Sequence, residues 1–415
     1  MLKSVSDPRQ SFFSRIFTSF SIKQWVLKLP FDQLEKGSLT LEIFGDVYRF
    51  EGKEAGRHAD LTILKPFRAY WLIKTQGELG FAQAYFEHAL DTNCLYALMY
   101  LGYENQNALQ GLLSHKTLNK LHLFKHRKRH NSVDNSKKNI SYHYDLGNVF
   151  YQKWLDKSMT YSSGIFESSD DTLEQAQQQK YDRLVDQLGV RPGDHVLEIG
   201  CGWGGMMQAL LERGVKVKGL TLSKEQQTYA QQRLSEFNPQ DYDVAYQDYR
   251  DETQQYDHIV SIEMFEAVGK EYWQNYFETL SQSLKTGGNA ALQVITINED
   301  YAQEYQDSVD FIQTYIFPGG LLPSVEQLKI LAAEHGFEVN NIYEFGYDYA
   351  KTCLLWKESF NNHSFELQVN GYDQKFQKMW NYYLDYCAVG FETQHISVHQ
   401  LTLKKIKEAN HVESI

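Results

Sequence analysis

A glycine-rich turn after a short apolar run is the feature that most constrains what this chain can fold into. It lies at residues 195–205, which read HVLEIGCGWGG. An apolar run that ends on an acid, here Glu198, is typical of a buried parallel strand. A helix-compatible stretch, Met206 to Arg213, follows the alternating glycines Gly200, Gly202 and Gly204. Glycine lets the backbone pass close to a ligand without Cβ clashes, so the segment predicts a strand, a tight turn and a helix.

The spacing of these glycines also indicates a class of ligand. The pattern G-x-G-x-G follows an acidic strand end and lacks a third glycine placed for a pyrophosphate. This favours S-adenosylmethionine over a dinucleotide. The alternative is a tight turn that binds nothing, because a glycine-rich turn alone is a weak signal.

Strand and helix patterns alternate on both sides of this turn. Further strands are predicted at 215–222, 242–246, 258–262 and 289–297, and helices at 172–188, 224–237 and 270–284. Such alternation predicts an α/β fold with a doubly wound sheet, whose ligands bind beyond the carboxyl ends of the strands. The pattern breaks at 298–324, an insertion that we expect to act as a lid.

A smaller α+β domain is predicted over residues 1–120. Its opening, Phe12 to Leu27, has the spacing of an amphipathic surface helix, or of a helix packed on its own domain. A hairpin is expected from Ser38–Phe44 and Val47–Phe50 around Gly45-Asp46, and another strand at 59–64. Residues 81–90 and 94–100 read as helices.

A basic linker is predicted at 121–138, followed by a catalytic domain at 139–415. The polar stretch 114–138 carries eight Lys and Arg residues and one acid, Asp134. In an otherwise acidic chain, such a run can dock on anionic phospholipid, each basic group contributing roughly 1 kcal/mol. A solvated, flexible linker is the alternative.

Composition excludes several classes of function. The net charge of −12 argues against nucleic acid as the main partner. The four cysteines, Cys94, Cys201, Cys353 and Cys387, show neither a CxxC pair nor zinc-ligand spacing, so no metal is expected. Because no apolar run is long enough to span a membrane and no signal peptide is evident, we expect a cytoplasmic protein, peripheral to the inner face of the membrane.

A series of sequence blocks resembles one enzyme family. The blocks are SYHYDLGNVFYQKWLDKSMTYSS (141–163), VLEIGCGWGG (196–205), GLTLSKEQ (219–226), QDYRD (247–251), SIEMFEAVG (261–269), FIQTYIFPGGLLPS (311–324), DYAKT (348–352) and YYLDYCAVGF (382–391). In this order they resemble the cyclopropane-fatty-acyl-phospholipid synthases, including the mycolic acid cyclopropane synthases. The resemblance implies a Rossmann-like, class I S-adenosylmethionine-dependent methyltransferase fold. It also implies transfer of a methylene to a cis double bond of a phospholipid acyl chain.

The resemblance assigns a cofactor site to this chain. It places Tyr161 and Ser162 beside the methionine end of S-adenosylmethionine. The cradle comprises Glu198, Gly200, Cys201, Gly202, Trp203 and Gly204. Thr221, Leu222, Ser223 and Gln226 are expected at the ribose, and Asp248 and Tyr249 at the adenine. An acid usually ends the second strand to bind the ribose, and Gln226 is the substitute here.

The resemblance also assigns catalytic residues. A bound bicarbonate is the family's base, and the matching positions here are Ser163, Glu266, Gln293, Ile295 and Tyr349. Ser163 stands at a Cys position and Gln293 at a His position, and both can still donate hydrogen bonds to an anion. Cys387 matches a cysteine described as an active-site residue, although a lone buried Cys is more often a small hydrophobe. Tyr161, Tyr315, Phe317 and Tyr349 are candidates to stabilise a carbocation.

The sequence therefore predicts a cyclopropane-fatty-acyl-phospholipid synthase that acts on unsaturated phospholipid at a membrane surface, with the chain as a monomer or a homodimer. Two alternatives stay open. One is a related lipid C-methyltransferase that makes a methyl- or methylene-branched chain, and the other is a catalytically silent lipid-binding paralogue.

Overall fold

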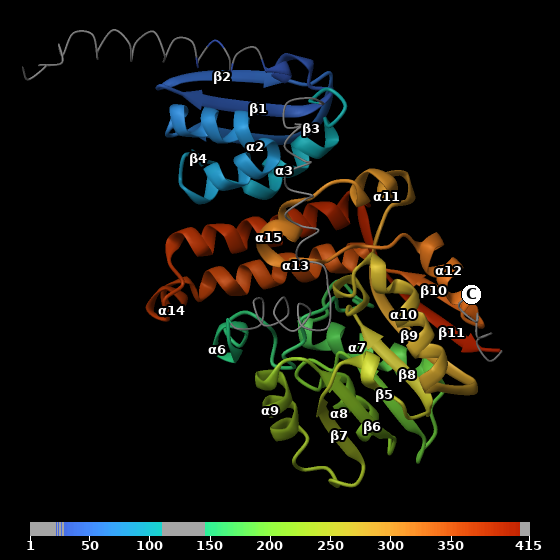
Figure 1. Ribbon diagram of the computed structural model, residues 1–415. Helices are drawn as coiled ribbons and strands as arrows, with labels where there is room; N and C mark the ends of the chain where they lie inside the picture. The colour runs from blue at the N-terminus through green and yellow to red at the C-terminus, as the bar shows by residue number, and fades with distance from the viewer. Residues whose placement is uncertain (1–21, 23, 25, 27–28, 110–145, 407–415) are drawn as a thin grey trace, which may run out of the picture. The chain divides into compact units, whose positions relative to one another are not determined.

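The structure is a computed structural model that describes residues 22, 24, 26, 29–109 and 146–406 (Figure 1). The predicted helix at 12–27, apart from three of its residues, and the predicted basic linker at 121–138 lie outside the described residues. The chain forms two compact units. The first unit comprises residues 1–121 and 371–389, and the second unit comprises 122–370 and 390–415.

The first unit is a four-stranded sheet with helices packed against it. The strand order is β2-β1-β3-β4, where β1 is Lys36–Ile43, β2 is Asp46–Glu51, β3 is Glu54–Ile63 and β4 is Leu90–Asp91. β1 pairs antiparallel with β2, which confirms the predicted hairpin, and parallel with β3. The helices are α2 (Pro66–Phe86) and α3 (Leu95–Glu104), after a short 3₁₀ turn, η1 (Pro30–Gln33). The helix predicted at 81–90 was wrong in its bounds, because α2 begins at Pro66 and Leu90 belongs to β4.

A segment from late in the sequence packs with this first unit. Helix α15 (Gln374–Glu392) carries Tyr382, whose ring meets Phe86 edge-on with the centroids 5.4 Å apart. Its Lys378 forms an ion pair with Asp91 at 3.0 Å. The predicted division assigned 371–389 to the catalytic domain, whereas these contacts place the segment with the first unit.

The second unit contains a seven-stranded sheet in the order β10-β11-β9-β8-β5-β6-β7. The strands are β5 (His195–Ile199), β6 (Lys216–Thr221), β7 (Tyr242–Tyr246), β8 (Tyr256–Ile262), β9 (Leu284–Ile297), β10 (Phe337–Glu344) and β11 (Ile396–Lys405). Only β11 runs antiparallel to its neighbours in this sheet. The predicted Rossmann-like α/β fold is confirmed. The sequence did not predict β10 and β11.

Helices cover both faces of this sheet (Figure 1). Side chains of α7 (Leu173–Leu188), α8 (Gly205–Leu211) and α9 (Lys224–Arg233) form one hydrophobic cluster with the strands. α10 (Trp273–Ser283) and α12 (Val325–Glu334) contribute to a second cluster. Neighbouring residues of β5 alternate between the clusters, Val196 in one and Leu197 in the other, as side chains of a strand buried on both faces must.

The remaining elements connect this framework. They are α6 (Asn148–Tyr151), η2 (Tyr249–Asp251), η3 (Phe265–Ala267), η4 (Lys270–Tyr272), α11 (Glu299–Gln306), η5 (Ile312–Ile316), α13 (Gly346–Asn362) and α14 (Ser364–Val369). The insertion predicted at 298–324 contains α11 and the π-helical turn η5.

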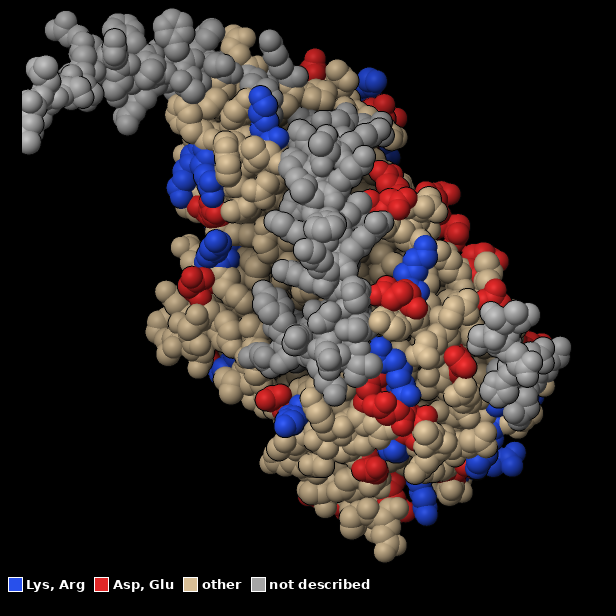
Figure 2. Space-filling model, viewed as in Figure 1, with Lys and Arg blue, Asp and Glu red and all other residues tan. Residues whose placement is uncertain are grey.

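No helix among the described residues is both long and apolar enough to cross a membrane. On the face shown in Figure 2, acidic and basic side chains of the described residues are interspersed among uncharged ones.

Candidate active site

The glycine turn after β5 has the open backbone that a bound ligand requires. Gly200, Gly202 and Gly204 all have positive φ angles, of 85°, 51° and 83°. A Cβ added at Gly202 would meet no atom within 4 Å among the described residues, so free space lies directly against the backbone there. Burial raises the pKa of the neighbouring Cys201 thiol well above its usual range, which keeps this thiol neutral. The turn has the geometry of a cradle for a ligand.

Glu198, at the carboxyl end of β5, offers that ligand an unused acceptor. Its carboxyl group is buried and accepts a hydrogen bond from the Met207 backbone amide, while Oε2 has no partner among the described residues. Burial raises the pKa of Glu198 to about 8. A buried oxygen without a partner is costly unless a ligand donates to it. S-adenosylmethionine carries an ammonium group and ribose hydroxyls, so the turn and Glu198 fit this cofactor.

The residues predicted at the ribose are brought together after β6. The Thr221 hydroxyl donates to the side-chain Oε1 of Gln226 at 2.9 Å. The backbone N–H of Gln226 donates to the Ser223 hydroxyl at 3.2 Å. All three side chains are buried, and Leu222 between them is half-buried. Ser223 caps α9, so helix formation itself fixes the position of Gln226.

The residues predicted at the adenine follow β7. Asp248 caps η2 by accepting from the Arg250 amide, and its carboxylate pairs with the Arg250 guanidinium at 2.7 Å. Tyr249 is buried and packs edge-on against Tyr276 with the centroids 5.3 Å apart. The carboxylate of Asp248 is therefore held by a neighbour of its own, and an adenine role for this pair stays a prediction.

Aromatic rings connect the glycine turn to the predicted catalytic residues. The ring of Trp203 lies 5.1 Å from that of Tyr151, and Tyr151 lies 5.5 Å from Tyr161, measured between centroids. Trp154 and Trp356 lie 5.3 and 5.4 Å from Tyr161. We call these rings, together with Phe317, which stacks on Tyr161 at 6.4 Å, the Tyr161 cluster.

A buried carboxylate that the sequence analysis did not single out, Glu263, lies at the centre of the predicted catalytic residues. Its Oε2 accepts from the Tyr349 hydroxyl at 2.5 Å, and its Oε1 accepts from Gln293 Nε2 at 2.8 Å and from the Ser163 backbone amide at 3.0 Å. The Tyr349 ring lies 6.0 Å from Trp356, which joins Glu263 to the Tyr161 cluster. Three of the five residues assigned to bicarbonate thus bind a carboxylate of the protein itself.

The other two residues assigned to bicarbonate meet each other. The Ile295 backbone amide donates to Oε1 of Glu266 at 2.5 Å, and Oε2 of Glu266 is buried without a partner among the described residues. Burial, and then the charge of Glu263, raise the pKa of Glu266 to about 8. Two buried acids this close do not both ionise readily, so Glu266 holds its proton at neutral pH.

A buried lysine supports the charge of Glu263. Lys180, on α7, donates to the Ser162 hydroxyl at 2.8 Å and to Oε1 of Gln177 at 2.7 Å. Burial lowers the pKa of Lys180 to about 7, and the nearby carboxylates oppose that shift, Glu263 most strongly. Ser162, predicted beside the methionine end of the cofactor, therefore has its hydroxyl oriented by Lys180.

The sequence as a whole places this site in a known family. The family model for mycolic acid cyclopropane synthetase matches residues 131–401. The chain belongs to this family.

Its relatives act on lipids. The chain is 39% identical to tuberculostearic acid methyltransferase UfaA1 of Mycobacterium tuberculosis over 284 residues, which is 66% of each protein. It is 38% identical to cyclopropane-fatty-acyl-phospholipid synthase of Escherichia coli, over 63% of this chain and 66% of that protein.

A solved structure of mycolic acid cyclopropane synthase CmaA1, complexed with SAH and CTAB, matches with a TM-score of 0.61 and 33% identity. That match covers 65% of this chain and 98% of the other. The second unit is therefore an S-adenosylmethionine-dependent methyltransferase domain.

Two further residues were predicted for this family site. Cys387 is on α15, in the segment that packs with the first unit, while the other predicted catalytic residues are in the second unit. Its catalytic role stays a prediction. Tyr315 packs against Phe311, with the centroids 5.4 Å apart, and its role at a carbocation stays a prediction.

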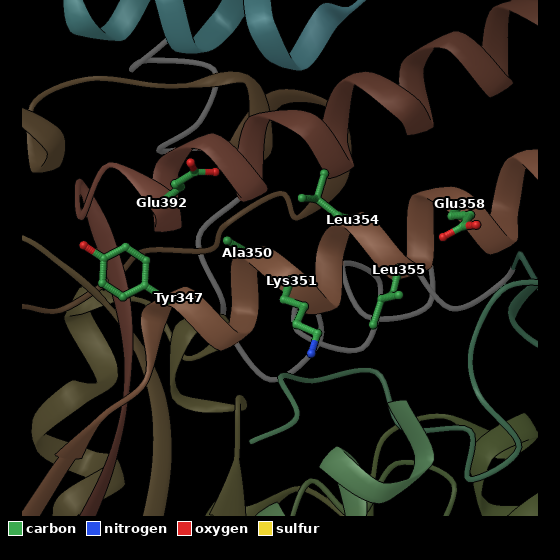
Figure 3. Close-up of a pocket in the computed structure, with 7 residues that line it drawn as sticks. All are labelled: Tyr347, Ala350, Lys351, Leu354, Leu355, Glu358 and Glu392. Atoms are coloured by element: carbon green, nitrogen blue, oxygen red, sulfur yellow. The ribbon is translucent and has the colours of Figure 1, made fainter. Parts of the chain in front are cut away.

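A pocket of about 410 Å³ follows the outer face of α13 (Figure 3). Its lining residues are Tyr347, Ala350, Lys351, Leu354, Leu355, Glu358 and Glu392. The helical period places Tyr349 and Trp356 on the opposite face of α13, toward the buried site. The pocket is thus separate from the residues assigned to the chemistry.

Glu263 was missed because it stands one residue beyond a strand, at a φ of 49° that favours glycine. The available signal was the pair of acids, Glu263 and Glu266, directly after β8 in SIEMFEAVG.

Proposed function

We propose that this protein is a cyclopropane-fatty-acyl-phospholipid synthase, which adds a methylene from S-adenosylmethionine to the cis double bond of an unsaturated phospholipid acyl chain. One observation carries the proposal. A continuous series of aromatic rings joins the cofactor turn at Trp203 to Tyr349, where the Tyr349 hydroxyl contacts a buried carboxylate. This arrangement combines faces for a cation with an acceptor for a proton.

The residues supply what an alkene methylation needs. Bound S-adenosylmethionine supplies an electrophilic methyl group, and the alkene that attacks it is a poor nucleophile. The site must therefore hold the alkene in line and exclude water. Trp154 and Trp356 are fully buried and pack against each other and against Tyr161, so the Tyr161 cluster provides dry, apolar walls.

The same rings stabilise the charge that the reaction creates. When the π electrons of the alkene form the new bond to the methyl carbon, the other alkene carbon becomes positive. An aromatic face contributes about 0.5–2 kcal/mol to a nearby cation, more when water is excluded. Tyr161 and Phe317 are stacked with an angle of 29° between their planes, and both were predicted to take this role.

The decisive experiment is a product analysis. The protein is incubated with S-adenosylmethionine and vesicles of a cis-unsaturated phospholipid, and the acyl chains are analysed by mass spectrometry. We expect chains heavier by one CH₂, and the shielded ring protons of a cyclopropane by NMR. Vesicles of a saturated phospholipid with the same headgroup are the control. No mass gain on the unsaturated lipid would overturn the proposal.

A second product is favoured by the departures at two predicted positions. Ser163 and Gln293 replace the Cys and His of the family pattern, and the Ser163 hydroxyl donates to the Gly164 carbonyl at 2.8 Å. The 39% identity to a tuberculostearic acid methyltransferase points the same way. A methylene-branched chain would show the same mass gain without cyclopropane protons in the NMR spectrum, whereas a saturated methyl branch would need an added reductant and would be heavier by two further hydrogens.

We further propose that the protein works at the cytoplasmic face of a membrane, through an apolar surface on the first unit. Phe44, Val47, Leu64, Phe67 and Trp71 are each at least 42% exposed, and Phe44 contacts Phe67 with the centroids 6.4 Å apart. A cluster of exposed aromatic side chains is typical of an interfacial anchor.

Vesicle flotation tests this membrane surface. The Phe67→Ser/Trp71→Ser double variant should lose most binding to anionic vesicles, whereas Ile330→Ser, at another exposed apolar position on α12, should retain it. Equal binding by both variants would contradict the assignment.

Sedimentation without lipid shows whether the same surface instead joins two copies of the chain as a homodimer. A variant of the predicted linker, with Lys125, Arg127, Lys128 and Arg129 replaced together, tests the basic patch in the same assay.

A further inference from the structure

The bicarbonate implied by the family resemblance does not fit this site. A bound anion needs donors that are free to serve it, and the donors here already serve Glu263. Gln293 has no spare capacity, because its Nε2 donates to Glu263 at 2.8 Å and to the Ser163 carbonyl at 3.5 Å, and its Oε1 accepts from Gln400 at 3.0 Å. A second anion would also lie against a buried carboxylate, where like charges repel strongly.

We propose that the Glu263 carboxylate is the general base of the reaction, built into the chain at the position that the resemblance assigns to bicarbonate. This inference rests on the proposed function. It names a residue to which the resemblance assigns no role, since the acid that it assigns, Glu266, is a different side chain with a different partner.

The backbone of Glu263 supports a specific role. A non-glycine residue in the left-handed region costs about 1–2 kcal/mol, and such strain persists where the surroundings hold the residue in place. Here the Glu263 amide donates to the Gln293 carbonyl at 2.7 Å, and both carboxylate oxygens are held by donors. The strained backbone directs the carboxyl group into the predicted catalytic residues.

The charges around Glu263 suit a base. Burial raises its pKa, and the donors from Tyr349, Gln293 and Ser163 act against that shift, as does the charge of Lys180. Gln293 and the Ser163 amide can only donate to Glu263, so they favour its ionised form. Glu266, which acts on Glu263, is protonated at neutral pH, and so is Glu198, which with Asp156 interacts with the same Lys180.

The proton transfer balances without a further reactant. After methyl transfer, one C–H bond of the added methyl group breaks. Its electron pair forms the third ring bond to the positive carbon, and the proton goes to the Glu263 carboxylate. The resulting carboxylic acid returns the proton to water when the product leaves. The Tyr349 hydroxyl, donating to Oε2, positions the carboxylate.

Two variants and one isotope measurement test the assignment. Glu263→Gln keeps the shape but cannot accept the proton, so we expect kcat to fall by about 10²–10⁴-fold. The affinity for S-adenosylmethionine, measured by calorimetry, should change by less than about threefold, because Glu263 does not touch the cradle. Glu263→Gly frees the three donors, and we expect added bicarbonate to restore part of its activity.

Binding of ¹³C-bicarbonate, followed by NMR, gives a readout that needs no lipid. We expect no binding by the unmodified protein and binding by Glu263→Gly. Wild-type activity should also be insensitive to removal of bicarbonate from the buffer. Activity that requires bicarbonate, bicarbonate binding by the wild type, or full activity of Glu263→Gln would each overturn the inference. If the wild type modifies no lipid at all, the proposed function fails, while the NMR result still decides whether Glu263 fills the anion site.

Discussion

Replacing Tyr349 by Phe separates the hydroxyl of this residue from its ring. The hydroxyl donates to Oε2 of Glu263 at 2.5 Å, while the ring stacks on Phe391 with the centroids 4.2 Å apart. A hydrogen bond to a charged group contributes about 1.5–3 kcal/mol, and one pKa unit corresponds to about 1.4 kcal/mol. Losing the donor destabilises only the ionised form, so the pKa of Glu263 should rise by about 1–2 units.

The assay is the pH profile of kcat/KM on cis-unsaturated phospholipid vesicles. If ionised Glu263 is the base, activity is lost as the pH falls through its pKa. The acidic limb of the Tyr349→Phe variant should therefore move to higher pH by about 1–2 units. The plateau at high pH should change little, because the aromatic ring is kept.

Tyr347→Phe is the matched control for this measurement. Tyr347 lies on the same helix, α13, and is 60% exposed. Its variant should leave the acidic limb in place. An acidic limb that stays unmoved in Tyr349→Phe, or that moves to lower pH, would refute the role given to the Tyr349–Glu263 contact.

Three further predictions concern the framework of the site. Thr172→Ala removes the capping box of α7, the helix that carries Lys180. It should lower the free energy of unfolding in urea by about 1 kcal/mol, whereas Thr172→Ser should stay close to wild type. An unchanged midpoint in Thr172→Ala would contradict this prediction. Gly202→Ala places a methyl group in the cradle and should weaken S-adenosylmethionine binding by at least about tenfold in calorimetry. Gly193 is the control, because its φ of 90° is also positive and a Cβ there would also meet no atom within 4 Å. Gly193→Ala should bear similar backbone strain without the loss of cofactor affinity. The pKa of Glu198 is raised to about 8, so the contribution of this residue to stability is present at low pH and is lost as the pH rises. Urea titrations of the cofactor-free protein should therefore show Glu198→Gln gaining stability relative to wild type between about pH 5 and 8. A stability difference between the two proteins that does not change with pH would contradict this prediction.

The sequence predicted the framework of the second unit well, because its signals are local. The apolar run of β5, the glycine-rich turn and the helix predicted at 172–188 each depend on neighbouring residues, and the structure contains all three. β10 was missed because it is an edge strand with mostly polar or exposed side chains, which leaves no apolar run to find. The packing of 371–389 with the first unit was missed because it depends on contacts between distant parts of the sequence.

Contacts between distant parts of the sequence also limited the prediction of the candidate site. The family pattern located Ser163, Gln293 and Tyr349, and the structure brings all three together. It could not show that their common partner would be a side chain of the same protein. Glu263 reaches them through a left-handed backbone conformation at the end of β8, and neither periodicity nor a motif spacing encodes that geometry.

A base that is part of the chain also changes which step decides the product. Ring closure and formation of an exocyclic methylene both remove a proton from the added methyl group, and they differ in whether a hydride first moves to the positive carbon from the carbon that bears the methyl. If Glu263 is the base, its carboxylate is held by the same three donors in either case, so its presence alone should not select between the two products. We then expect the lifetime of the cation to decide the product, and we expect the rings of the Tyr161 cluster to set that lifetime. We therefore expect Phe317→Leu, which removes the ring stacked on Tyr161, to change the ratio of cyclopropane to branched product, whereas Glu263→Gln should lower the yield of both together. An unchanged product ratio in Phe317→Leu, measured by NMR on lipid from the same incubation, would contradict this division of roles.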